Sequence, residues 1–331
     1  MTIYDIAKAA NVSASSVSRV INGKSGVSNA TRQKVLKILE ECNYVPNEAA
    51  RVLVNQSSRL IGILIADVRN LHHMEGAYYI QSEIEKNGYN GIIMNAGYDA
   101  AGLAHILDNL NQRRVEGLVL MGSIFQSKVM EDTLRHHLSD IPIIMINGNL
   151  DIPNCYSILA QEKEGIANCV DFFVSRGRSN IAYITNAVTP SNLLKLEGFH
   201  EGIAAHKKSG VHGRVYKDEQ DDSLKGGYDT MQRVLREHPE VDAVICAVDL
   251  LAAGALQALL EKRIEVPREI AIIGVDNSIF GEICYPRLTS LDNQIFSSCV
   301  VGAHQLLDAL NGGHPTRCVS IQTVLIERET T

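Results

Sequence analysis

Three polar side chains of this chain each follow a short apolar segment, at positions suited to binding a small molecule. Asn147, Asp249 and Asp276 come one to three residues after runs of aliphatic residues, Met or Cys. Ligands of parallel α/β sheets bind beyond the carboxyl ends of the strands, where amide and carboxylate oxygens accept hydrogen bonds from hydroxyl groups. The pattern predicts a site for a small hydroxyl-rich molecule. A structural interpretation stays open, because Asp249 can cap a helix and Asp276 can belong to a turn.

No enzyme motif accompanies these residues. The chain contains no G-x-S-x-G, G-x-x-x-x-G-K-[ST], H-E-x-x-H or G-x-G-x-x-G sequence, which are signatures of common catalytic and cofactor sites. Two pairs of adjacent histidines stand at 72–73 and 136–137. Neighbouring side chains on a helix point in different directions, whereas a zinc site needs convergent ligands. We therefore expect solvated histidines, no metal site, no cofactor and no catalytic residue.

Charge is distributed unevenly along the chain. Residues 1–60 carry eight Lys and Arg against four Asp and Glu, a net charge of +4. Because the whole chain carries −7, the remainder carries −11. Short segments vary in charge by chance, but a basic head on an acidic body is typical of a protein whose head alone contacts nucleic acid.

The composition indicates a soluble protein of the cytoplasm. The seven cysteines are scattered and form no C-x-x-C pair, as is typical of reduced thiols rather than of a disulfide framework. The N-terminus has no basic segment followed by an apolar core, so we expect no secretory signal. No apolar run is long enough to cross a membrane.

The apolar pattern changes character near residue 60. Before it, apolar residues at helical spacing predict short helices, with Ser13 and Ser28 as the caps of the second and third, and residues 48–54 as a very short fourth. After it, strand-like apolar runs alternate with helical stretches, which indicates two parallel sheets covered on both faces. The length of 331 residues also exceeds what one domain usually reaches, about 250–300 residues.

The first two predicted helices, joined by a tight turn, form a helix-turn-helix. The second can enter a DNA major groove, and its exposed positions are Ala14, Ser15, Ser16, Ser18 and Arg19. Small residues allow close approach to the bases, and Arg19 can donate two hydrogen bonds to guanine O6 and N7. The composition alone fits equally well with a small helical lobe that has a serine-rich face.

Specific segments go beyond this general pattern. Residues 2–13 read TIYDIAKAANVS and residues 17–22 read VSRVIN, followed by YVPN at 44–47 and AARVL at 49–53. Further along, RVEGL at 114–118, GVDN at 274–277 and LIER at 325–328 appear in that order. These segments resemble the lactose-repressor (LacI/GalR) family of transcription regulators, and the resemblance covers essentially the whole chain.

The resemblance implies an N-terminal all-α helix-turn-helix head with a hinge helix, residues 1–58, followed by a two-subdomain α/β periplasmic-binding-protein-like body, residues 59–331. It places an N-subdomain at about 59–158 and 291–318 and a C-subdomain at about 159–290 and 319–331, with crossings near 159, 290 and 319. It further implies a homodimer on a pseudo-palindromic operator in double-stranded DNA. The DNA-contacting positions would be Thr2, Tyr4, Ala14, Ser15, Ser16, Ser18, Arg19, Asn22, Asn47, Ala50 and Leu53. Leu53 would be a wedge between base pairs, in a hinge helix too short to be stable alone.

The resemblance also places an effector between the two subdomains. The expected contacts are His72, His73, Phe125, Asn147, Lys195, Asp222, Asp249, Asp276 and Asn293. The two histidines stand where relatives carry an aromatic pair, Lys195 where they carry Arg, and Asn293 where they carry Gln. Because stacking surface is lost and hydrogen-bonding groups are gained, we expect a small polar effector, a sugar, that controls a DNA-binding repressor. The alternative is a soluble solute-binding receptor without a regulatory DNA role.

Overall fold

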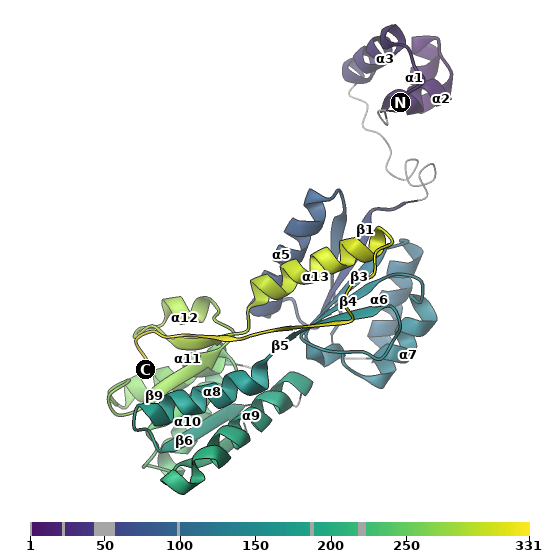
Figure 1. Cartoon of the computed structure of the whole chain (residues 1–331). Helices are drawn as coiled ribbons and strands as arrows, with labels where there is room; N and C mark the ends of the chain where they lie inside the picture. Colours follow the sequence, from purple (N-terminus) through teal and green to yellow (C-terminus); the bar gives the residue numbers. More distant parts are fainter. Residues whose placement is uncertain (1, 22–23, 43–56, 98–99, 186–188, 218–222) are drawn as a thin grey trace. The chain divides into compact units, whose positions relative to one another are not determined.

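The computed structural model describes residues 2–21, 24–42, 57–97, 100–185, 189–217 and 223–331. The chain divides into two compact units, Met1–Ser58 and Arg59–Thr331. In Figure 1 the helices of the first unit are purple, and the second unit runs from blue through green to yellow. Each unit has its own hydrophobic core and is described by itself.

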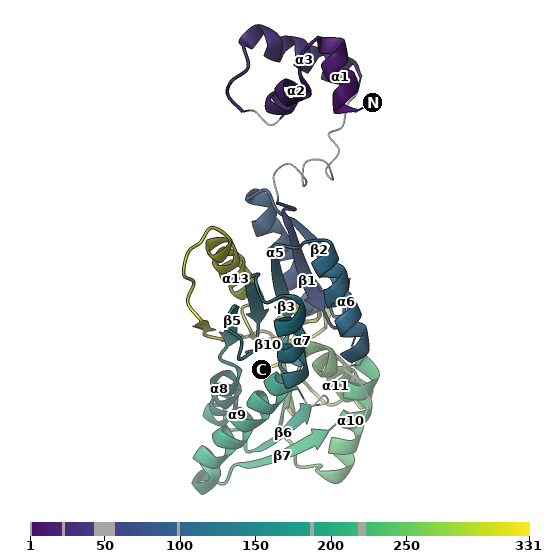
Figure 2. The ribbon, with the colours of Figure 1, turned by 90° about the vertical axis from the view of Figure 1, so that its right-hand side faces the viewer.

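The unit Met1–Ser58 has three helices among its described residues (Figure 2). They are α1 (Ile3–Ala10), α2 (Ala14–Ile21) and α3 (Asn29–Glu41). Thr2 begins α1 with a capping box, in which its side chain accepts a hydrogen bond from Asp5 N and the Asp5 carboxylate accepts one from Thr2 N. Ser28 begins α3 as predicted, because its Oγ accepts a hydrogen bond from Thr31 N at 3.2 Å.

One apolar side of each helix forms the core of this unit. Ile6 of α1, Val17 of α2 and Val35 of α3 are fully buried against one another. Asn11 has a left-handed backbone, φ 52°, and turns the chain tightly between α1 and α2. The predicted helix-turn-helix is therefore present, with the exposed side of α2 opposite the core.

The N-subdomain is built on a parallel six-stranded sheet with the strand order β11-β5-β4-β3-β1-β2. Its strands are β1 (Leu60–Ile65), β2 (Asn90–Asn95), β3 (Gly117–Met121), β4 (Ile143–Ile146), β5 (Cys155–Ala160) and β11 (Cys318–Ile321). Its helices are α5 (Leu71–Lys86), α6 (Ala100–Gln112), α7 (Lys128–His137), α13 (Ile295–Leu310) and the short η1 (Ser123–Phe125).

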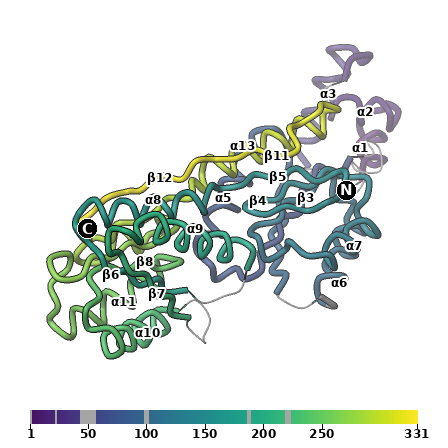
Figure 3. The backbone as a smooth tube through the Cα atoms, turned by 60° about the horizontal axis from the view of Figure 1, so that its bottom comes forward, coloured from purple at the N-terminus to yellow at the C-terminus, as the bar shows by residue number. Residues whose placement is uncertain are grey.

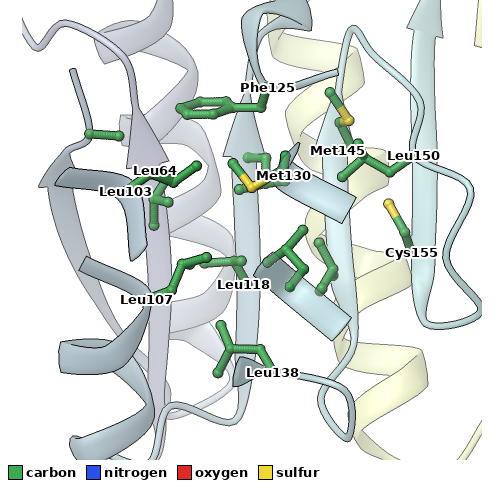
Figure 4. Packing of buried hydrophobic residues seen from close by; sticks show 14 of the residues in the cluster. Leu64, Leu103, Leu107, Leu118, Phe125, Met130, Leu138, Met145, Leu150 and Cys155 are labelled. Carbon is green, nitrogen blue, oxygen red and sulfur yellow. The ribbon is translucent and has the colours of Figure 1, made fainter. Parts of the chain in front are cut away.

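Side chains alternate between the two faces of this sheet. Ile61, Ile63 and Ile65 of β1 pack beneath α5 and α13, whereas Leu64 packs with α6 and α7. Figure 4 shows the apolar layer between the sheet and helices α6 and α7, in which Phe125 lies with Met130 and other apolar side chains. Burial on both faces explains why the central strands are continuous apolar runs.

The C-subdomain repeats this architecture with the strand order β12-β10-β9-β8-β6-β7, parallel except for the antiparallel pair β10–β12. Its strands are β6 (Asn180–Thr185), β7 (His212–Lys217), β8 (Ala243–Cys246), β9 (Ala271–Val275), β10 (Thr289–Asp292) and β12 (Val324–Ile326). Its helices are α8 (Glu162–Ser175), α9 (Pro190–His206), η2 (Lys207–Ser209), α10 (Leu224–Glu237), α11 (Asp249–Glu261) and α12 (Ile279–Ile283). Helices α8 and α9 cover one face, and α10 and α11 cover the other.

The chain passes between the subdomains three times within the described residues (Figure 3). It leaves the first sheet after β5, returns after β10 to form α13, and leaves again between β11 and β12. The joining segments lie at 160–162, 292–295 and 321–324, each slightly beyond the positions expected from the resemblance. Among the described helices, none combines the length and apolar character that a membrane span requires.

Candidate functional site

The exposed side of α2 carries the residues expected to read DNA. Ser15 and Arg19 are exposed, and Ser16 and Ser18 are half-buried. The hydroxyl of Ser13 hydrogen-bonds those of Ser15 at 2.8 Å and Ser16 at 2.9 Å, so the start of α2 presents a preformed group of hydroxyls. A small, polar helix start followed one turn later by Arg19 is suited to approach base edges.

Other expected DNA contacts have different surroundings. Thr2 and Tyr4 are exposed on α1, the Tyr4 side chain by 73%, and Ala14 is half-buried at the start of α2. The remaining four positions lie outside the described residues, and they are Asn22, Asn47, Ala50 and Leu53.

In the body, a polar network joins elements of both subdomains. Asn293, in the segment between β10 and α13, donates hydrogen bonds to Glu162 Oε1 at 3.1 Å and to Asp276 Oδ1 at 3.0 Å. Lys195 of α9 lies 3.4 Å from the same Glu162 oxygen and donates to the carbonyl of Ala247 at 3.1 Å. These contacts bring together three predicted residues, Asn293, Asp276 and Lys195, from distant parts of the sequence.

The network reaches the N-subdomain through α5. His72 Nε2 lies 3.9 Å from Asp276 Oδ1, across the boundary between the subdomains. A second direct contact across that boundary is the hydrogen bond from Ser191 N of α9 to Ser123 Oγ of η1, at 3.1 Å. We call the group His72, Glu162, Lys195, Asp276 and Asn293 the inter-subdomain network.

His73 is held beside this network by local backbone chemistry. Asn70 caps α5 by accepting a hydrogen bond from His73 N at 3.1 Å. Gly122 has φ 103°, and a Cβ there would lie 2.9 Å from the His73 ring, so a glycine is required at that position. Burial first, and the neighbouring His72 second, lower the pKa of His73 to about 4. At neutral pH the ring is therefore uncharged and can both donate and accept a hydrogen bond.

Asp249 is engaged by the protein itself. Its Oδ1 accepts a hydrogen bond from Ser290 Oγ at 2.6 Å, and its Oδ2 accepts two from Ser278, at 2.7 Å from N and 2.8 Å from Oγ. Burial, with the nearby negative charge of Asp276, raises the pKa of Asp249 to about 7. This carboxyl group therefore fastens the loops after β8 and β9 together, a structural role beside the network.

Four buried polar atoms of this region have no hydrogen-bond partner among the described residues. They are His72 Nδ1, His73 Nδ1, Glu162 Oε2 and Asn293 Oδ1. Buried polar atoms are nearly always paired in folded proteins, and an unpaired one costs about 1–3 kcal/mol. A concentration of four such atoms beside one network indicates a place where a polar ligand supplies the missing partners.

The structure corrects some of the expectations about this site. His72, with a side chain 16% exposed, and the half-buried His73 are not the solvated histidines that the adjacent pair predicted. Lys195, an expected effector contact, is 3% exposed. Phe125 is a core residue, 5% exposed and packed in the layer of Figure 4.

Asn147 also has a structural task. Its backbone is left-handed, with φ 55°, and its Oδ1 accepts a hydrogen bond from Ala160 N at 3.4 Å, which ties the end of β4 to that of β5. Asp222, the remaining expected effector contact, lies outside the described residues.

Glu162 is the network residue that the sequence analysis did not identify. It is 1% exposed although it is the first residue of α8, directly after the crossing that follows β5. The available signal was its place just beyond the carboxyl end of a strand, where ligands of α/β sheets bind. That signal was hidden because β5 itself was not predicted.

Two other features lie apart from the inter-subdomain network. His137 pairs with Asp108 at 2.8 Å, and no group of three potential metal ligands exists in the part of the chain that the structure describes. A pocket of about 250 Å³ lies at the start of β6 and β7, lined by His212, Arg214 and Tyr216 among others. It contains no residue of the inter-subdomain network.

Comparisons with known proteins agree with the two-unit architecture. A family model described as bacterial regulatory proteins, lacI family, matches residues 2–47, and one described as a periplasmic binding protein-like domain matches residues 170–331. Two solved structures have the same fold. The lac repressor dimer bound to operator and the anti-inducer ONPF has a TM-score of 0.88 at 24% identity, over 100% of this chain and 98% of that one. The regulator CelR in complex with cellobiose has a TM-score of 0.72 at 22% identity, over 100% of both chains.

Sequence relatives extend over the full length. An HTH-type transcriptional regulator of Lachnoclostridium phytofermentans is 32% identical, over 100% of this chain and 99% of the relative. Catabolite control protein A of Priestia megaterium is 27% identical, over 94% of this chain and 93% of the relative. With a helix-turn-helix head, a two-subdomain α/β body and these relatives, the chain belongs to the lacI family of bacterial regulatory proteins and is a transcription regulator, not an enzyme.

Proposed function

We propose that this regulator is a repressor that binds a pseudo-palindromic DNA operator as a homodimer, and that a sugar held between its subdomains controls the affinity for DNA. The observation that carries the ligand part is the set of four unpartnered buried polar atoms beside a network that joins both subdomains. Hydroxyl groups both donate and accept hydrogen bonds, so one sugar can satisfy histidine nitrogens and carboxylate or amide oxygens together.

Two further observations support the ligand class. Among the network residues only His72 has an aromatic ring, and none is Phe, Tyr or Trp, so the described site offers mainly polar contacts rather than a broad stacking platform for a nucleobase. Two proteins of the same fold were solved with sugars, CelR with cellobiose and a regulator from Alkaliphilus metalliredigens with D-xylulofuranose.

The DNA part is supported by the exposed face of α2 and by the basic charge of the head. The lac repressor, whose fold this chain shares, was solved as a dimer on its operator. A dimer places two such helices on successive turns of one DNA face, which makes the preferred site a near-palindrome.

The test begins with selection of an operator from random DNA by the full-length protein, followed by affinity measurements with and without sugars. Arg19→Ala is expected to cost about 1–3 kcal/mol in operator binding and to relax the preference at one base pair of each half-site. Lys37→Ala on α3, which removes the same charge from a residue paired with Glu41, is the control and is expected to leave the base preference unchanged.

A second variant tests whether a sugar bound in the body controls the affinity for DNA. Asp276→Ala is expected to abolish the response to sugar while operator binding survives, because the carboxylate belongs to the body and not to the head. Failure to select any DNA sequence, with sugar binding intact, would overturn the operator part of the proposal. Tight binding of a nucleobase in place of a sugar would overturn the ligand class.

A further inference from the structure

The region around the inter-subdomain network carries an excess of negative charge. Glu162 and Asp276 belong to the network, and Asp292 lies next to Asn293 and accepts hydrogen bonds from Asn277 Nδ2 and Gln294 N. Lys195 is the ammonium group opposite them. His73 adds no positive charge at neutral pH, because burial lowers its pKa to about 4.

Arg328 does not reverse this balance. Arg328 donates to Asn277 Oδ1 at 2.7 Å, one residue away from Asp276. Its guanidinium also lies 3.3 Å from Glu282, so its charge is already paired. A ligand bound at the network therefore meets a negative field in a buried setting, where charges are poorly screened.

The unpartnered atoms of Glu162 and Asn293 point to the same kind of ligand. Both hydrogen bonds of Asn293 Nδ2 go to carboxylate oxygens, which only accept. This fixes the orientation of the amide, so that its Oδ1 is the atom left without a partner. Glu162 shares Oε1 between Lys195 and Asn293, and its Oε2 is left without a partner among the described residues. Two acceptors are thus available, and each requires a donor from the ligand.

We propose that Glu162 is a specificity-determining residue that restricts the effector to sugars presenting hydrogen-bond donors, either uncharged or carrying an ammonium group, and that excludes sugars carrying a carboxylate or a phosphate. The inference rests on the proposed sugar function and narrows its ligand class. A hydroxyl or ammonium group satisfies Glu162 Oε2 and Asn293 Oδ1, whereas an anionic group offers them no donor and is repelled by the surrounding carboxylates.

The test is isothermal titration of the full-length protein with matched sets of sugars. Each set contains a neutral hexose, its 2-amino form, its uronate and its 6-phosphate, in the gluco and galacto series. The neutral or amino member is expected to bind at least about 100-fold more tightly than the acidic members, since like charges brought together in an interface are strongly disfavoured. Binding of a uronate or phosphate as tightly as its neutral form would overturn the inference and leave the sugar proposal standing.

Two variants assign the selectivity to one residue. Glu162→Gln keeps the size of the side chain and removes the charge, and it is expected to narrow the neutral-to-acid ratio to within about tenfold by weakening the repulsion. Glu164→Gln, two residues along the same helix and exposed, is the control and should leave the ratio unchanged. If circular dichroism shows that Glu162→Gln is folded and its ratio of neutral-sugar to acidic-sugar affinity equals that of wild type, then Glu162 does not determine the specificity. If no member of any set binds wild-type protein, the sugar proposal fails, and this inference fails with it.

Discussion

Replacing Lys195 by Met tests whether the buried ion pair at the centre of the network stabilises the body. The substitution keeps a long unbranched side chain and removes only the ammonium group. In the native protein that group lies 3.4 Å from Glu162 Oε1, and the two side chains are 4% and 1% exposed. Lys195→Met therefore leaves a carboxylate that is buried and has lost its opposite charge.

The structure sets the size of the effect. Breaking a buried ion pair by removing one partner costs about 3–5 kcal/mol. The hydrogen bond from Asn293 to Glu162, 3.1 Å long in the native protein, does not involve Lys195 and is expected to remain in the variant. The expected loss therefore lies near the lower end, about 3 kcal/mol. The second substitution, Glu162→Gln, removes the stranded charge. The double variant is therefore expected to be more stable than Lys195→Met alone, by about 1–2 kcal/mol.

The assay is urea denaturation at pH 7, followed by circular dichroism, of wild type, both single variants and the double variant. Lys163→Met is the control, because Lys163 lies next to Glu162 in sequence but is 32% exposed and pairs on the surface with Glu197 and Glu201. Its loss is expected to stay below about 1 kcal/mol. The reasoning is refuted if Lys195→Met destabilises the protein no more than Lys163→Met, or if the effects of the two network substitutions simply add.

Two further predictions concern pH. The pKa of Asp249 is raised to about 7 in the folded protein from 3.8, so the folded state holds its proton more tightly and stability is lost as pH rises from about 4 to about 7, by roughly 4 kcal/mol. Asp249→Asn should remove this loss. Between pH 5 and pH 8, the melting temperature of the variant relative to that of wild type should therefore increase as the pH rises. The pKa of His73 is lowered to about 4 from 6.5, so the unfolded chain binds the proton first and stability falls as pH drops below 6.5, by up to about 3 kcal/mol. In urea denaturation between pH 7 and pH 4.5, the unfolding free energy of His73→Asn should fall less with decreasing pH than that of wild type. An equal dependence on pH in the two proteins would contradict a native His73 ring that is held neutral.

Much of the fold could be predicted because its core signals are local. The apolar run that begins at residue 60 forms strand β1 over its whole length, Leu60–Ile65, since a strand buried on both faces is apolar at every position. The caps of the head helices are equally local, because Ser28 bonds a backbone group only three residues away.

Strands β7 and β11, which lie at sheet edges, could not be found in this way. Strand β7 (His212–Lys217) has one buried residue, Tyr216, and β11 (Cys318–Ile321) has none. Such segments lack both the continuous apolar run and the strict alternation that identify a strand. Their extended form is stabilised by hydrogen bonds to a neighbouring strand far away in sequence, as in the register of Asn180 with His212.

The candidate site was predictable only where position along a strand determines the direction of a side chain. Asp276 follows β9 and belongs to the network, as its place after a strand implied. Asn147 follows β4 in the same way, but its left-handed backbone directs the amide to Ala160 N. An acidic residue in the first turn of a helix, such as Glu162, is ordinarily explained by the helix dipole. Its burial depends on Lys195 and Asn293, which no local pattern associates with it.

The positions of Glu162 and Asn293 connect the site to movement of the body. Glu162 begins α8 directly after the crossing from β5, and Asn293 lies in the crossing from β10 to α13. Relative motion of two domains is taken up by the few residues of the segments that join them. A ligand that hydrogen-bonds Glu162 Oε2 and Asn293 Oδ1 would therefore hold two of the three joining segments and would favour one arrangement of the subdomains. Because coupling free energies are reciprocal, whichever arrangement DNA binding favours must change ligand affinity by the same factor. It follows that operator DNA should shift the sugar affinity of wild-type protein, and that Glu162→Gln should diminish this shift.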